Sequence, residues 1–223
     1  MEFILKNKPF AIRSAELFAT IPNPNSLRKS WLCKYHPEAD PRPFWSLEVW
    51  AEGEWYEGDE EEEMGGVEAR ATAEEMRFPI RRWTYVQGQT VEWAGPYDEK
   101  VGGPYGVFYL EEHDIIRRAR LRFTERDGTA FRFEWEGVCN VYGDEGYERD
   151  VPFSTAGWAR FTGVTVYGGG ADTDESLRGR LAQYFDPRDF VQGSLLSRSD
   201  RHGYFRRVKS SHAVFTPSDA RAA

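Results

Sequence analysis

The chain has 223 residues, of which 40% are hydrophobic and 30% charged, a balance that excludes a disordered or fibrous protein. Its 37 acidic and 29 basic side chains give a net charge of −8, which argues against a general nucleic-acid-binding protein because that class needs a basic surface. Two cysteines, Cys33 and Cys139, are too few for a disulfide scaffold or a four-cysteine metal site, and whether they pair stays open.

The first 43 residues predict an irregular arm. Prolines stand at positions 22, 24, 37, 41 and 43, and each fixes its own backbone angle and disfavours helix in the residue before it. We expect at most a short helical turn near residues 14–19. The start has no apolar stretch long enough for a signal peptide, and no segment reaches the ~18 apolar residues of a membrane span. We therefore expect a cytoplasmic protein without a membrane partner.

From Phe44 onward the hydrophobic pattern has a period of two, which is typical of half-buried strands. Trp45, Leu47 and Val49 alternate with residues 46, 48 and 50 in this way. The 8 tryptophans, 11 tyrosines and 15 phenylalanines also favour strands over helices. The other predicted strands are 67–73, 81–86, 89–94, 106–110, 115–124, 129–137, 158–167 and 204–215.

Turn chemistry predicts a hairpin over residues 115–137. A three-residue loop at 126–128, with Gly128 in the left-handed position, pairs Phe123 with Phe131. On the other face Arg118 then meets Glu136. A two-residue Asp-Gly turn would place charged residues opposite apolar ones, so the three-residue loop is favoured.

Two structural interpretations follow from this hairpin logic. The arginines at 118, 120 and 122, facing Glu134 and Glu136, form an outer, solvent-facing ladder rather than an anion-binding stripe inside a barrel. The same logic predicts a loop at 86–88 that pairs Trp83 with Val91.

One helix is predicted late in the chain. Asp172 or Thr173 can cap it, and Leu177, Leu181 and Phe185 form an apolar row before the proline at position 187. About nine strands with one late helix predict an all-β protein with an antiparallel β-barrel, and a two-sheet sandwich is the alternative. We divide the chain into the arm at 1–43, one barrel domain at 44–216 and a disordered tail at 217–223.

The most acidic stretch is the segment 52–63, which contains eight glutamates or aspartates among its twelve residues. Like charges repel one another, so a solvated loop is expected, and the alternating ligand spacing of a calcium loop is missing. Alternatively, the segment covers a basic protein partner, which would make this a non-enzymatic interaction protein of the immunity or inhibitor type.

No group of residues has the spacing of an established catalytic or metal site. The four histidines lack metal-ligand spacing, and neither a nucleophile elbow nor a phosphate-binding glycine loop is present. We therefore expect no metal and no cofactor. The candidate catalytic residues are Glu111, Glu112 and His113, because a histidine beside carboxylates can act as a general base.

Aromatic residues on the predicted strands are the candidate ligand-binding residues. A barrel of about eight strands either fills with side chains or holds one small ligand, and an aromatic ring offers both area and a polar handle. The alternatives are an ordinary aromatic core, or a carbohydrate-binding sandwich that uses Trp50 and Trp55. The candidates are Trp83, Tyr85, Trp93, Phe133, Trp135, Trp158 and Phe161.

The late helix followed by a last strand resembles the arrangement of the lipocalins (calycins). The nearest matches to their Gly-x-Trp signature are Gly53-Glu54-Trp55 and Gly157-Trp158. This resemblance implies a barrel that binds a small apolar or aromatic ligand, either as a binding protein or as a cofactor-independent cyclase, isomerase or hydratase. It implies nothing about the oligomeric state.

Residues 104–167 also resemble an accessory β-rich domain found with some bacterial glucose–methanol–choline oxidoreductases. The catalytic and flavin-binding parts of that family are absent, so the resemblance implies no redox chemistry. The matching segments are Gly106-Val107-Phe108-Tyr109-Leu110, Arg120-Leu121-Arg122-Phe123 with Asp127-Gly128, and Phe133-Glu134-Trp135-Glu136-Gly137.

Overall fold

The computed structural model describes residues 1–23, 42–53, 67–96, 105–110, 113–143, 146–169, 172–200 and 208–218. They form β1 (Glu2–Leu5), β2 (Lys8–Ile21), β3 (Phe44–Gly53), β4 (Val67–Met76), the 3₁₀ turn η1 (Trp83–Val86), β5 (Thr90–Trp93), β6 (Gly106–Tyr109), β7 (His113–Asp127), β8 (Ala130–Gly143), β9 (Gly146–Gly169), α3 (Asp174–Tyr184), the 3₁₀ turn η2 (Pro187–Asp189), β10 (Phe190–Asp200) and β11 (Val208–Pro217).

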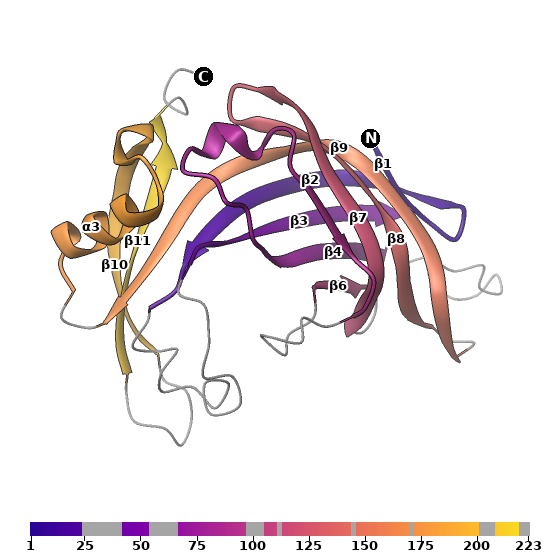
Figure 1. The fold of residues 1–223 in the computed structure, drawn as a ribbon. Coiled ribbons are helices and arrows are strands. Elements are labelled where there is room, and N and C mark those ends of the chain that lie inside the picture. Colours follow the sequence, from indigo (N-terminus) through magenta and orange to yellow (C-terminus); the bar gives the residue numbers. More distant parts are fainter. Residues whose placement is uncertain are drawn as a thin grey trace.

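The strands form one sheet that closes into a ring of eight, in the order β1, β2, β3, β4, β6, β7, β8 and β9. The 24-residue strand β9 closes the ring, pairing with β8 along one edge and with β1 and β2 along the other. Beyond the ring, β11 and β10 extend the sheet from β9, and α3 lies beside them (Figure 1). The prediction of an all-β, barrel-like fold with one late helix is therefore confirmed.

The N-terminal residues are part of the barrel, so the prediction of an irregular arm is wrong for residues 1–21. These residues form β1 and β2, and β2 pairs with β3 on one side and with β9 on the other. Leu17, Ala19 and Ile21 are fully buried on one face of β2. The prolines at 22 and 24 follow the strand instead of interrupting it, and residues 24–41 lie outside the described part.

The hairpin of β7 and β8 has the predicted faces but a different register. Asp127 pairs with Ala130 and Phe123 with Phe133, so the turn is formed by residues 128 and 129. One extra residue, Thr124, is inserted in β7 between these pairs. The predicted partners are displaced by two residues, and a displacement of two keeps every side chain on its predicted face. Gly128 has the predicted positive φ, of 53°.

We expect Gly128→Val to destabilise the protein by roughly 1–2 kcal/mol, because a β-branched residue is strained in the left-handed region. A side chain at this position would meet no atom within 4 Å, so the loss would come from the backbone alone. The free energy of unfolding in urea measures it. An unchanged unfolding midpoint would contradict the assigned conformation of this turn.

Residues 81–94 do not form the predicted hairpin. Residues 83–86 are the turn η1, and Val91 of β5 pairs with Leu121 of β7 rather than with Trp83. The reason is tertiary: Trp83 is 1% exposed and its ring packs on Phe131 and Phe161. In the turn η1 this large ring is buried among residues of β8 and β9.

The late helix agrees with its prediction. Thr173 is the N-cap residue and forms a reciprocal capping box with Ser176. Leu177, Leu181 and Phe185 are fully buried, as the apolar row requires. No helix in the described ranges is long and apolar enough to cross a membrane.

Aromatic side chains fill the core. Phe161 illustrates the packing, since its ring lies 5.3 Å from that of Trp45 and 5.4 Å from that of Trp83. Large hollows are found instead on the surface, as described below. The largest fully buried side chains are Trp45, Trp83, Trp135, Phe3, Phe10, Phe108, Phe123, Phe131, Phe133, Phe161, Phe185 and Phe215.

Candidate functional site

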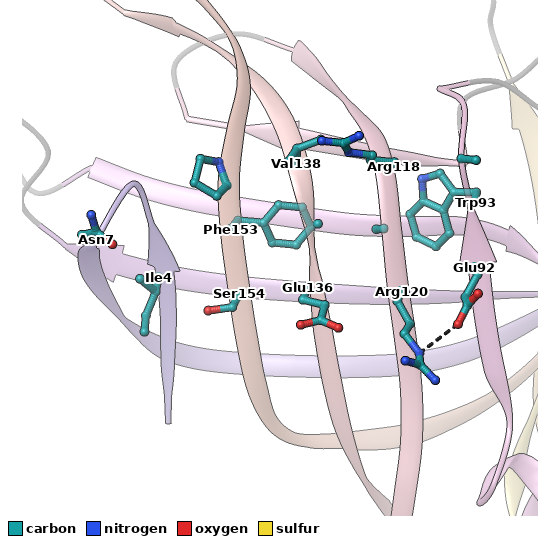
Figure 2. A pocket seen from close by; sticks show the side chains of 14 residues that line it. Ile4, Asn7, Glu92, Trp93, Arg118, Arg120, Glu136, Val138, Phe153 and Ser154 are labelled. Atoms are coloured by element: carbon teal, nitrogen blue, oxygen red, sulfur yellow. Dashed lines mark ion pairs between the residues drawn. The ribbon is translucent and has the colours of Figure 1, made fainter.

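A groove of about 830 Å³ lies on the outer face of β7, β8 and β9, which we call the outer groove (Figure 2). Strand β5 bounds it on one side and the hairpin of β1 and β2 on the other. A smaller hollow of about 290 Å³ shares Ile4, Glu136 and Ser154 with it. The side chains of the outer groove that matter below are those of Ile4, Trp93, Arg118, Glu136, Val138 and Ser154.

Strands β7 and β8 approach each other closely at the outer groove. Gly137 on β8 lies directly opposite Ala119 on β7. A Cβ atom at Gly137 would lie 2.7 Å from the Ala119 Cβ and would also collide with the Arg118 carbonyl oxygen. Glycine is therefore required for this close approach of the two strands.

Charged side chains cross the outer groove from strand to strand. Arg120 lies between Glu92 of β5 and Glu136 of β8 in the sheet register. Its guanidinium turns to Glu92, with 2.9 Å between Nε and the carboxylate, as Figure 2 shows. In the next row Arg122 pairs with Glu134 at 2.6 Å. Glu136 consequently has no ion pair with any described residue.

Arg118 is the second charge of the outer groove without an ion pair among the described residues. The prediction placed it opposite Glu136, but the structure places it opposite Val138, because the turn at 128–129 and the extra residue Thr124 displace the pairing by two residues. It forms no ion pair within the described ranges. Arg118 and Glu136 thus bring one positive and one negative group to a groove that also contains the apolar side chains of Val138 and Trp93.

This arrangement has a definite chemical capacity. A guanidinium accepts a carboxylate in a two-point hydrogen-bonded geometry, and a carboxylate accepts N–H groups. Apolar side chains beside both charges can cover a hydrocarbon or aromatic body. Sequence reasoning found both charged residues but missed the site, because it paired them with each other.

The predicted catalytic residues are not tested by the structure. Glu111 and Glu112 lie outside the described ranges, and only the backbone of His113 is described, where it pairs with Tyr109. Most of the acidic segment, residues 54–63, also lies outside them. Among the residues that the structure does describe, no three histidines, cysteines or acids are grouped to hold a metal ion.

The seven predicted ligand-binding aromatic residues do not gather at one site. Trp83 stacks on Phe161, whereas the ring of Trp93 lies 6.3 Å from that of Trp135 in another group of rings. Trp93 lines the outer groove and Trp135 the smaller hollow beside it. The remaining three are the buried Phe133 and the exposed Tyr85 and Trp158.

Trp50, a candidate sugar-binding platform, is already covered. The guanidinium of Arg70 lies 4.6 Å from the centre of its ring and 5.3 Å from that of Tyr109. The three residues are aligned across β3, β4 and β6, so their contacts form a cation–π ladder. Trp55 lies outside the described ranges.

The chain matches no protein-family model and no curated protein, and its fold matches no solved structure. The resemblances to the lipocalins and to the oxidoreductase accessory domain therefore stay predictions.

Proposed function

We propose that this protein binds a small ligand with an apolar or aromatic body in the outer groove. The ligand carries a carboxylate, an amine or both, which pair with Arg118 and Glu136. The groove volume of about 830 Å³ is that of a small-molecule site.

The observation that carries this proposal is the pairing of the surrounding charges. Arg120 and Arg122 each reach a glutamate, at 2.9 and 2.6 Å. Among the described residues Arg118 and Glu136 have no ion-pair partner at the groove, so we take them to be available to a ligand.

The packed core supports a site on the outer face rather than inside the barrel. Beneath the groove, Trp135 packs edge to face on Phe153 with 5.4 Å between the ring centres. Both side chains are buried, at 1% and 4% exposure. A floor held by such rings keeps the groove in shape before the ligand arrives, which lowers the entropic cost of binding.

We expect Ser154→Trp to abolish ligand binding. Ser154 is exposed on β9 and lines both hollows, so an indole would occupy the ligand's volume, while tryptophan remains a favourable strand residue. Arg160→Trp is the matched control, because Arg160 is exposed on the same face of the same strand but lies outside the groove. Fluorescence titration with phenylnaphthylamine, a neutral aromatic probe, measures the binding.

The parent chain and the control should bind the probe saturably, and the blocked variant at least about tenfold more weakly. Equal affinities of parent and blocked variant would contradict the proposal. Untargeted mass spectrometry of molecules that copurify with the parent, but not with the blocked variant, would then identify the natural ligand. Arg118→Gln and Glu136→Gln test its charged groups separately.

A further inference from the structure

A cavity of about 420 Å³, separate from the two hollows described above, lies where the segment 77–81 meets the C-terminal end of α3. Two hydrogen bonds join these elements: Arg81 donates to the Ala182 carbonyl oxygen at 3.3 Å, and its own carbonyl accepts from Asp186 N–H at 3.0 Å. We call it the arginine cavity. It is lined by Arg42, Arg77, Phe78, Arg81, Tyr184 and Phe185, among others.

The arginine cavity is positively charged although the protein is acidic overall. Three arginines line it, and none of its described lining residues is acidic. Arg77 donates a hydrogen bond of 2.6 Å to the Arg42 carbonyl oxygen, which positions the guanidinium without neutralising it. Within the described ranges neither Arg77 nor Arg81 forms an ion pair.

The two aspartates that follow α3 are held by other arginines. Asp186 forms two hydrogen bonds with the Arg188 guanidinium, at 2.7 and 3.0 Å. This contact lowers the pKa of Asp186 to about 2, so its carboxylate stays ionised and paired. Asp189 is bound in the same two-point manner by Arg82, at 2.7 and 2.9 Å. Among the residues that the structure describes, the charges of Arg77 and Arg81 therefore have no counterion.

The opposite wall of the arginine cavity is aromatic and reaches the core. The rings of Phe78 and Phe185 lie 5.7 and 5.9 Å from that of Trp45. The Trp45 Nε1–H donor is buried and has no hydrogen-bond partner among the described residues. A buried donor without an acceptor is unfavourable, and the ring that carries it packs against two lining side chains of the cavity.

We infer that the arginine cavity binds a small organic anion whose oxyanion pairs with Arg77 and Arg81 and whose apolar body packs on Phe78 and Phe185. Guanidinium groups recognise carboxylate, sulfonate and phosphate oxygens by the same paired hydrogen bonds. The volume fits a small molecule rather than a polypeptide. This site shares no lining residue with the outer groove, so the inference is independent of the proposed function.

Anilinonaphthalene sulfonate, an aromatic anion, tests the inference in a fluorescence titration. The affinity for this anion is measured in the Ser154→Trp chain, in which the outer groove is blocked. It is compared with the affinity of the same chain for the neutral phenylnaphthylamine. Saturable binding of the anion alone is expected, and added salt should weaken it. Arg81→Gln should weaken it by about tenfold or more, since one charged hydrogen-bonding partner is lost.

Arg160→Gln is the control, because Arg160 is an exposed arginine that lines neither the outer groove nor the arginine cavity. It should leave the affinity for the anion unchanged. Arg77→Gln should act like Arg81→Gln. If it also lowers the unfolding midpoint, the exposed Arg81 still provides the test, because among the described residues its side chain donates a single hydrogen bond, to a helix carbonyl.

The inference would be overturned if the Ser154→Trp chain bound the anion with the same affinity with and without Arg81→Gln. Equal binding of the anionic and neutral probes in the groove-blocked chain would also overturn it. A failure of the proposed function would give a different result. Phenylnaphthylamine would then bind the Ser154→Trp chain as tightly as the parent chain, independently of the results for Arg77→Gln and Arg81→Gln.

Discussion

Gly163→Ala is expected to destabilise the protein by about 2–4 kcal/mol. Gly163 has a φ of 130°, a conformation that residues with a side chain rarely adopt. A Cβ atom there would collide with the Phe215 carbonyl oxygen and lie 3.1 Å from its carbonyl carbon. Backbone strain and a steric clash would therefore add at one position.

The position of Gly163 in the fold increases the effect. One edge of β9 pairs with β8 as far as Arg160 and with β11 from Val164 onward, while the other edge pairs with β2. The β2 pairing also shifts its register at this point. Because strands lie on both sides, neither β9 nor β11 can move aside without breaking hydrogen bonds.

Urea unfolding measures this loss, and Gly179→Ala is the control. Gly179 lies within α3, and a Cβ atom there would meet nothing within 4 Å. Alanine is the better helix former, so the control should stabilise the protein by roughly 0.5–1 kcal/mol. Opposite signs are expected for the two variants. A similar effect of both would show that the conformation of Gly163 is not constrained.

Trp83→Ala is expected to cost about 3–5 kcal/mol, because the surrounding rings can close only part of the void. Trp83 is 1% exposed. Its ring stacks on Phe161 at 5.4 Å, meets Phe131 edge to face at 6.0 Å and is covered by the Arg126 guanidinium at 5.4 Å.

Tyr85→Ala is the matched control for Trp83→Ala. Tyr85 belongs to the same turn η1 but is 58% exposed, so its loss should change stability by no more than about 0.5 kcal/mol. A small loss for Trp83→Ala, together with saturable probe binding that this variant weakens, would show that the ring borders a ligand cavity inside the barrel. The site would then have to be sought there and not in the outer groove.

The sequence alone determined those elements whose signals are local. The α3 helix was predictable because Thr173 caps it and Leu177, Leu181 and Phe185 recur at helical spacing. The faces of β7 and β8 were predictable because side chains alternate strictly along a strand. Such patterns depend only on neighbours within a few positions, so no knowledge of the rest of the chain is needed.

Tertiary contacts decided the elements whose local signals are weak or contradictory. Strand β2 has small and polar residues beside prolines, and it is a strand because β3 and β9 supply hydrogen bonds on both its edges. The turn η1 has the alternating pattern of a strand, but burial of Trp83 among distant rings overrides it. Propensity is a small energy beside the burial of a whole indole.

Both candidate sites arise from contacts that no local pattern specifies. Arg118 and Glu136 are adjacent in the predicted ladder, but the turn at 128–129 and the extra residue Thr124 separate them, and neither has an ion pair among the described residues. The arginine cavity assembles Arg42, the segment 77–81 and the end of α3, which lie far apart along the chain. Composition and periodicity determine which residues are apolar or charged and which face they occupy. Which charges remain unpaired depends on strand register and on long-range packing, because an ion pair requires its two partners within about 4 Å.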